Sequence, residues 1–158
     1  SATLCDGVIA SENATFSTPF SALGIVPEGC SSVHFARIMG DANAQRMLGE
    51  EGWKPSANEA KEAGLIQWAT SQADLMTEAK KIAKGWVEDG ATRTYRGGST
   101  KQELKEVNAL ESVALADAFL AAPFMKAQFK FLLSKKKPGP AAMFGAMLVT
   151  RPLWSRLL

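Results

Sequence analysis

The residue in this sequence best suited to acid/base chemistry is Glu28, which lies between a proline and a glycine in the stretch GIVPEGCSS. Two β-branched apolar residues, Ile25 and Val26, come shortly before it, and small polar residues follow it. Acidic residues are common in the first turn of a helix, where the helix dipole favours them. The spacing alone therefore leaves two interpretations: an ordinary helix-start carboxylate, or an acid/base at the mouth of a pocket.

Other candidates for catalysis or metal binding are few. The only histidine, His34, and the two cysteines, Cys5 and Cys30, do not supply a convincing set of metal ligands, although Cys30 and His34 are spaced i,i+4. The cysteines have apolar neighbours, so we expect two buried free thiols. We expect His34 to be packed in the interior, and we expect no metal ion and no resident cofactor.

The composition narrows the class of protein. The chain has 158 residues, enough for one domain with a real core, and 18 Lys+Arg against 16 Asp+Glu give a net charge of +2. That charge gives no electrostatic case for binding nucleic acid. No apolar run approaches the roughly 20 residues of a membrane span, so we expect no membrane insertion, and the N-terminus lacks the pattern of a signal peptide.

The elements that would position Glu28 are short in the first 70 residues and helical afterwards. A capping box, Ser56 with Glu59, predicts one helix start, and Gly40 and Gly49 predict helix ends. We expect strands over residues 4–12, 14–19 and 65–69. We expect helices over residues 28–40, 42–49, 56–64, 71–90, 101–121 and 122–137, then a break at 138–140 and a helical tail to Thr150.

Two long segments, LCDGVIASENATFSTPFSALGIVPEGCSSVHFARIMG and MLGEEGWKPSANEAKEAGLI, resemble the crotonase (enoyl-CoA hydratase/isomerase) superfamily. The matching features occur in order: Cys5-Asp6 in a strand, TFSTPF as the next strand, LG at 23–24, the PEG turn, and SANEAKEAGL. The match is distinctive over residues 1–70 and looser to about residue 135. It implies a mixed α/β (α+β) fold: a crotonase-like ββα superhelix, incomplete at its N-terminus, with a C-terminal helical oligomerisation region.

The resemblance also implies a division of the chain. Residues 1–90 would be the C-terminal part of the spiral core, residues 91–137 a helical trimerisation region, and residues 138–158 a tail. Family members are longer, and their N-terminal part supplies the backbone N–H groups of an oxyanion hole. We therefore expect this chain to be a piece of a longer protein, inactive alone, whose intact form is a homotrimer or a dimer of trimers.

Within the superfamily, the sequence looks most like the peroxisomal Δ3,Δ2-enoyl-CoA isomerases. Hydratases carry one of two catalytic glutamates right after the proline of the second strand, where this chain has Phe20. The isomerases carry a lone glutamate where this chain has Glu28. The resemblance thus implies an acyl-CoA thioester as substrate and Glu28 as the base that moves a proton from C2 to C4. Phe20, Ile25 and Val26 either are ordinary core residues or line the acyl pocket. We expect them to desolvate Glu28 and raise its pKa.

Further expectations concern the C-terminal part. Lys126 and Lys130 either form the solvated face of an amphipathic helix or meet the phosphates of coenzyme A, as basic residues of this region can in the family. The tripeptide SRL at 155–157 is similar to a peroxisomal address, although Leu158 follows it. We expect a peroxisomal location, and otherwise a mitochondrial one.

Two other functions remain open on the sequence. The chain could belong to another crotonase-fold acyl-CoA enzyme, hydratase-like or in secondary metabolism. It could also be a non-catalytic crotonase-like binding module.

Overall fold

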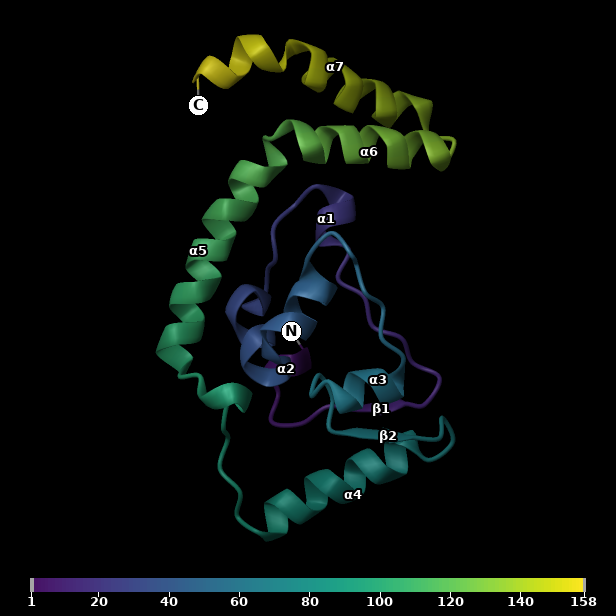
Figure 1. Cartoon of the computed structure of the whole chain (residues 1–158), viewed down its shortest axis with the longest axis vertical. Coiled ribbons are helices and arrows are strands. Elements are labelled where there is room, and N and C mark those ends of the chain that lie inside the picture. The colour runs from purple at the N-terminus through teal and green to yellow at the C-terminus, as the bar shows by residue number, and fades with distance from the viewer. Residues whose placement is uncertain (1, 158) are drawn as a thin grey trace.

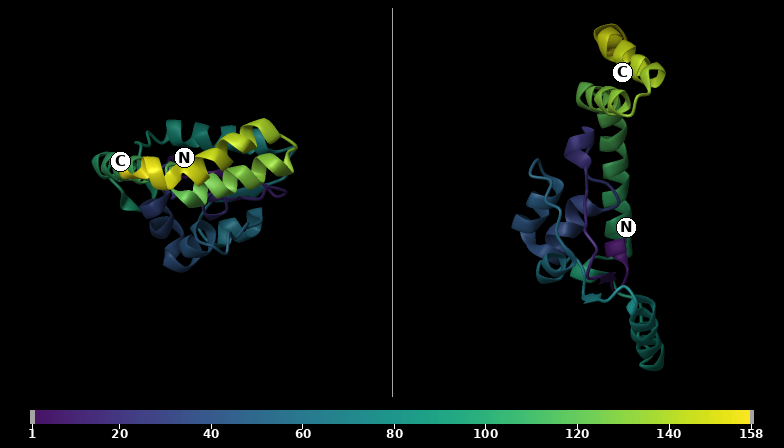
Figure 2. Two further views of the ribbon diagram at one scale, coloured as in Figure 1. Left: turned by 90° about the horizontal axis from the view of Figure 1, so that it is seen from above. Right: turned by 90° about the vertical axis from the view of Figure 1, so that its right-hand side faces the viewer.

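The chain forms an elongated arrangement built around a small central body, as a computed structural model shows for residues 2–157 (Figures 1 and 2). Short strands and helices make the body, α4 lies at one end, and a long helix, α5, runs along the body to a helical hairpin at the other end. The α-helices are α1 (Phe20–Leu23), α2 (Ser31–Leu48), α3 (Ala57–Glu62), α4 (Leu75–Glu88), α5 (Lys101–Phe119), α6 (Ala122–Ser134) and α7 (Pro138–Trp154). The remaining elements are the strands β1 (Ile9–Ser11) and β2 (Trp68–Thr70) and the 3₁₀ turns η1 (Ala2–Leu4), η2 (Arg96–Gly98) and η3 (Ser155–Leu157).

A two-stranded parallel sheet pairs the N-terminal segment of the body with the segment before α4. β1 pairs with β2 in a register that sets Ile9 opposite Trp68 and Ser11 opposite Thr70. Both strands are shorter than expected. Cys5 and Asp6 lie in a bend before β1 instead of in a strand.

The strand expected over residues 14–19 does not form within the described part of the chain. This stretch makes only an isolated antiparallel bridge, Thr15 with Ser56, and the N–H of Phe16 donates to the carbonyl of Pro55 at 3.0 Å. Its neighbour is therefore the loop that enters α3. Because Pro55 has no N–H to donate, that loop cannot extend the bridge into a ladder.

The core of the body lies between α2, α3 and the segment that follows α3. Its buried side chains are Phe35, Met39, Ala44, Met47, Ala57, Ala60, Leu65 and Ile66. Gly40 interrupts α2 with φ 76° and ψ 157°, so the helix consists of two parts that meet where the sequence predicts a stop. The predicted capping box is also confirmed, because Ser56 accepts the N–H of Glu59 and Glu59 accepts the N–H of Ser56.

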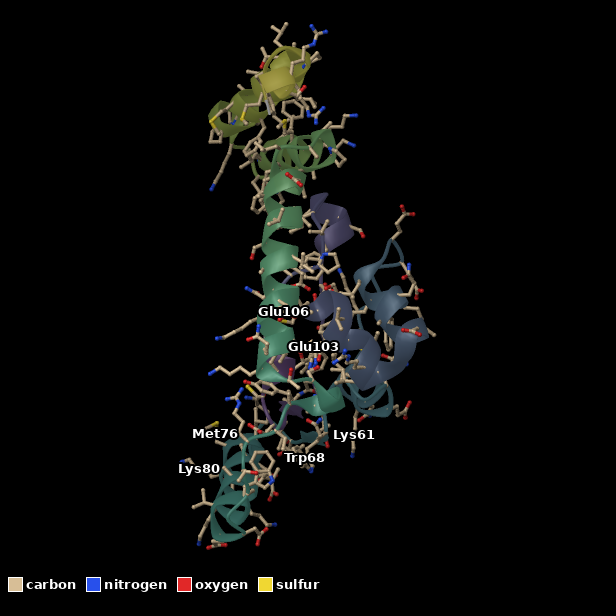
Figure 3. The ribbon with its side chains drawn as sticks, turned by 90° about the vertical axis from the view of Figure 1, so that its left-hand side faces the viewer. Lys61, Trp68, Met76, Lys80, Glu103 and Glu106 are labelled. Atoms are coloured by element: carbon tan, nitrogen blue, oxygen red, sulfur yellow. The ribbon has the colours of Figure 1, made fainter. Side chains whose placement is uncertain are left out.

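The helix α4 lies at the edge of the body, and none of its residues is buried. Trp86 packs against Trp68 of β2, with ring centroids 6.1 Å apart, and Figure 3 shows Trp68 beside this helix. The loop after α4 returns to the body through Arg96, which donates to the carbonyls of Gly64 and Leu65.

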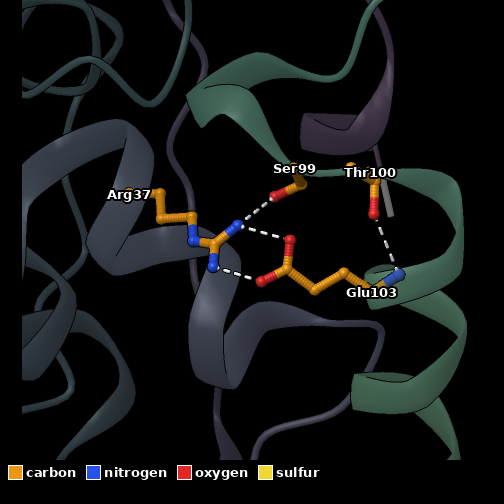
Figure 4. A network of polar contacts seen from close by, with 4 residues as sticks. All are labelled: Arg37, Ser99, Thr100 and Glu103. Atoms are coloured by element: carbon orange, nitrogen blue, oxygen red, sulfur yellow. Dashed lines mark hydrogen bonds and ion pairs between the residues drawn. The ribbon is translucent and has the colours of Figure 1, made fainter.

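The start of α5 is held against α2. Arg37 of α2 donates to both carboxylate oxygens of Glu103 and to the hydroxyl of Ser99 at 2.9 Å (Figure 4). Thr100 caps α5 by accepting the N–H of Glu103 at 3.1 Å. The orientation of α5 relative to α2 is thereby fixed near its first turn.

The C-terminal helices α6 and α7 lie side by side as an antiparallel hairpin (Figures 1 and 2). The segment 138–140 begins α7 instead of breaking the chain, because a proline in the first turn lacks an N–H that has no helical partner there. The helix runs to Trp154, beyond the predicted end at Thr150. No single helix in residues 2–157 is long and apolar enough to cross a membrane; α5 and α6 meet that test only as a pair bent by 66°.

Candidate active site

Glu28 lies in a turn that joins α1 to α2. α1 ends at Gly24 in the left-handed conformation, and residues 25–28 then run without regular secondary structure. Gly29 and Cys30 are also left-handed, with φ 65° and 66°. The next helix begins at Ser31, whose N–H and hydroxyl both donate to the carbonyl of Glu28, at 3.2 Å and 2.7 Å. A helix start at this turn is thus confirmed, a few residues later than the sequence predicts.

The Glu28 side chain is exposed, and its carboxylate has no hydrogen bond or ion pair to any other residue between positions 2 and 157. Phe20, Ile25 and Val26 are half-buried. The expectation that they desolvate Glu28 is wrong for this chain, because the carboxylate keeps its contact with solvent. Their role as the lining of an acyl pocket stays a prediction.

A second carboxylate, which the sequence reasoning missed, lies at the same turn. Glu111 of α5 is buried, with 6% of its surface exposed. It accepts the N–H of Cys30 at 2.6 Å, the N–H of Ser32 at 3.0 Å and the hydroxyl of Ser32. These N–H groups stand at the start of α2, where backbone donors have no helical partner and the dipole favours a negative charge.

A signal for Glu111 is present in the sequence. The less exposed residues of α5 recur at spacings of three and four, as expected for one helix face. They are Leu104, Val107, Glu111, Leu115 and Ala118, together with Glu103, which pairs with Arg37. A carboxylate in the middle of such an apolar stripe indicates a buried group with polar partners.

The remaining polar residues near the turn are structural. The Cys30 thiol is buried and donates to the carbonyl of Leu104 at 3.2 Å; burial, and then the negative charge of Glu111, raise the pKa of this thiol. His34 is fully buried, as expected, and its Nε2 donates to the carbonyl of Thr3 at 2.8 Å. Burial lowers the pKa of His34, which favours the neutral ring. Cys5 is exposed, so the expectation of two buried thiols holds only for Cys30.

The helix α6 reaches the segment that leads to Glu28. A Cβ added to Gly24 would lie 2.6 Å from the carbonyl carbon of Pro123, so the first turn of α6 packs directly on the end of α1. Lys126 and Lys130 are one turn apart on α6, both exposed and outside the ion pairs found among residues 2–157. The structure thus brings the first turn of their helix to the segment that leads to Glu28.

Residues 2–157 contain no cluster of three His, Cys, Asp or Glu side chains that could hold a metal ion. An open cavity of about 480 Å³ lies between α4 and the loop that follows it. Its lining residues are Asp6, Ala83, Trp86, Val87, Ala91, Thr92, Arg93 and Thr94, so it is separate from the Glu28 turn.

Comparison with known proteins gives a consistent set of relatives. A family model described as enoyl-CoA hydratase/isomerase matches residues 2–130. Human enoyl-CoA delta isomerase 2 is 40% identical over 141 residues, 85% of this chain and 35% of the relative. Mouse enoyl-CoA delta isomerase 3, peroxisomal, is 36% identical over 85% of this chain and 44% of the relative. Human chromodomain Y-like protein is 35% identical over 84% of this chain and 23% of the relative. The chain thus spans less than half the length of each.

The solved structures give the same picture. An enoyl-CoA hydratase/isomerase from Pseudoalteromonas atlantica T6c superposes with a TM-score of 0.67 at 27% sequence identity. The match covers 84% of this chain and 54% of that protein. The described elements therefore correspond to about half of a larger fold.

Proposed function

Because the chain belongs to the enoyl-CoA hydratase/isomerase family, we propose that the intact protein converts 3-enoyl-CoA thioesters to 2-trans-enoyl-CoA thioesters. The membership confirms the family resemblance and the crotonase-like, mixed α/β fold expected from the sequence. The observation that carries the proposal is the contrast between Phe20 and Glu28. The family resemblance places one hydratase glutamate at the position of Phe20, which is apolar, whereas the Glu28 carboxylate lies exposed in the turn before α2.

A single carboxylate suffices for the isomerisation. Glu28 removes a proton from C2 of the acyl thioester, and the electron pair moves into a dienolate whose negative charge rests on the thioester oxygen. The protonated Glu28 returns the proton at C4, so the double bond moves and the carboxylate is regenerated. The backbone donors that would stabilise the oxyanion are expected before Ser1, outside the described residues.

The exposure of Glu28 is compatible with this role. A carboxylate without an ion-pair partner can accept and return a proton without first breaking a salt bridge. Desolvation of Glu28 would come with the acyl chain, which covers the turn when it binds. The left-handed Gly29 leaves space beside Glu28, because it has no Cβ.

The test is a Glu28→Gln variant of the intact protein, assayed for conversion of a 3-enoyl-CoA to its 2-trans isomer. We expect kcat to fall by about 10²–10⁴-fold, the range of a lost general acid/base. Glu12→Gln, which alters an exposed turn carboxylate of the same body, is the matched control and should retain activity. Near-wild-type turnover of Glu28→Gln would refute the assignment of the base.

A second candidate function is binding without catalysis. The similarity to chromodomain Y-like protein favours it, since that name states no reaction. Saturable acyl-CoA binding by the intact protein, with no turnover in a panel of 3-enoyl and 2-enoyl thioesters, would support this alternative. Hydration of the 2-enoyl substrates would instead indicate a hydratase, which the proposal does not expect because Phe20 cannot position water.

The proposal extends to assembly and location. Large apolar side chains stay exposed on the C-terminal helices, among them Leu110, Val113, Phe119, Phe131 and Leu133. Burial between copies would remove them from water, which supports a homotrimer through residues 91–137. A peroxisomal relative and the SRL tripeptide support a peroxisomal location. The tripeptide forms η3, and Leu158 lies outside the described residues.

A further inference from the structure

The buried carboxylate of Glu111 joins two parts of the chain that are far apart in sequence. Its donors belong to Cys30 and Ser32, 81 and 79 residues away, and all of them lie in the turn and first residues of α2. A buried carboxylate is stable only when polar partners replace its water. Glu111 has three such partners, all within four residues of Glu28.

The backbone that Glu111 holds is the part that sets the direction of Glu28. Gly29 and Cys30 both have positive φ, a conformation that a residue with a Cβ seldom adopts. Cys30 is therefore strained and needs an anchor. Its N–H donates to Glu111 at 2.6 Å and its thiol donates to the carbonyl of Leu104 at 3.2 Å, so α5 supplies both anchors.

The helix that presents Glu111 is itself fixed. Eight residues before Glu111, Glu103 is paired with Arg37 of α2 and capped by Thr100 (Figure 4). Figure 3 shows Glu103 and Glu106 on the part of α5 that leads to Glu111. The Glu111 carboxylate thus approaches α2 from a helix whose first turn is anchored to α2, and such support helps to hold a reacting group in a productive geometry.

We propose that Glu111 is a positioning residue for Glu28: its hydrogen bonds to Cys30 and Ser32 hold the left-handed turn in the conformation that aims the base at the substrate. The inference rests on the proposed isomerase function. Glu111 does not touch the substrate or carry the proton. Its removal lets the turn relax, so the base reaches its geometry in a smaller fraction of molecules.

The first experiment measures isomerase kcat and KM of the intact protein with Glu111→Ala, Glu111→Gln and Ser32→Ala. We expect Glu111→Ala to lower kcat by about 10²-fold, the cost of misplacing a catalytic group by about 1 Å, with KM little changed. Glu111→Gln should retain more activity, because its amide oxygen still accepts one N–H. Ser32→Ala removes only the hydroxyl donor, so we expect it to fold even if Glu111→Ala does not. It should lower kcat by less than Glu111→Ala does.

The matched control is Glu106→Gln, which alters an exposed carboxylate on the same helix and should leave kcat unchanged. The second readout is hydrogen exchange of the Cys30 and Ser32 amides, which should accelerate in Glu111→Ala but not in Glu106→Gln. A structural role alone would speed exchange without lowering kcat. Comparison of kcat with exchange therefore separates positioning from stability.

The outcomes distinguish the two proposals. If Glu28→Gln abolishes turnover while Glu111→Ala and Ser32→Ala keep wild-type kcat, the positioning inference is overturned and the isomerase function stands. If Glu28→Gln retains turnover, the function of Glu28 is wrong and the positioning role falls with it. A lower kcat in Glu28→Gln, Glu111→Ala and Ser32→Ala, with faster exchange of the Cys30 amide in Glu111→Ala, supports both the isomerase function and the positioning role.

Discussion

Replacement of Gly24 by alanine tests whether the C-terminal helices dock on the candidate site. Gly24 has φ +67°, and an added Cβ would lie 2.6 Å from the carbonyl carbon and 2.7 Å from the next backbone nitrogen at the start of α6. Both contacts are with backbone, so no flexible side chain can move aside. The substitution must either distort the end of α1 or push α6 away.

The expected cost has two parts. A left-handed alanine costs about 1–2 kcal/mol relative to glycine. Overpacking against a fixed neighbour adds about 1–3 kcal/mol. Gly90→Ala provides the control, because Gly90 has φ +64° but nothing within 4 Å of its added Cβ. It should show the first cost alone.

Hydrogen exchange of the α6 amides in the intact protein measures the effect at the contact. If the loss reaches about 2 kcal/mol or more, exchange in the first turn of α6 should accelerate at least about 30-fold in Gly24→Ala. It should not change in Gly90→Ala, which lies at the end of α4. Equal exchange of α6 in the two variants would refute the docking of α6 on α1.

Three further predictions concern the pH dependence of stability, the coenzyme and the location of the protein. Burial, with the nearby charges of Arg96 and Arg37, lowers the folded-state pKa of His34, so the unfolded state binds the proton more readily. The stability due to neutral His34 is therefore complete above the unfolded pKa of about 6.5 and is lost as the pH falls from there through the lower folded-state pKa. His34→Gln should flatten this slope of stability against pH in urea unfolding, and an unchanged slope would assign it to other groups. Replacing both Lys126 and Lys130 with Glu should raise KM several-fold for a CoA thioester but not for a pantetheine thioester, which lacks the coenzyme phosphates. The same replacement of Lys80 and Lys84 is the control and should leave KM unchanged. Equal effects of the two pairs would contradict contact with the coenzyme phosphates. A fluorescent version of the intact protein should coincide with a peroxisomal marker, and a mitochondrial pattern would contradict the proposed location.

Local signals in the sequence predicted local structure well. The capping box at Ser56 and Glu59 and the break at Gly40 depend on residues within one or two turns, and both are found in the structure. The strand expected at 14–19 failed because a strand needs a neighbour, and its neighbour here is a loop containing Pro55. Pairing between distant segments is not encoded in the pattern of either segment alone.

For the candidate site, too, the sequence predicted the local features and not those that depend on distant segments. Glu28 and the turn that carries it were predicted from the residues and the family resemblance, but the exposure of Glu28 was not, because exposure depends on what packs over the turn. Glu111 was missed because its partners are about 80 residues away. The apolar stripe of α5 indicated that Glu111 is buried, but it could not indicate against which element.

The two carboxylates at the start of α2 have opposite surroundings, and this contrast bears on the chemistry. Both oxygens of Glu111 accept hydrogen bonds from Cys30 and Ser32, so a proton placed there would compete with the bonds that hold the turn. Glu28 has no such bonds within residues 2–157 and faces solvent. Of the two, only Glu28 can gain and lose a proton without disturbing the backbone that positions it. A reaction that returns the same proton to the substrate requires that freedom, because the base must be regenerated in the same geometry in every cycle.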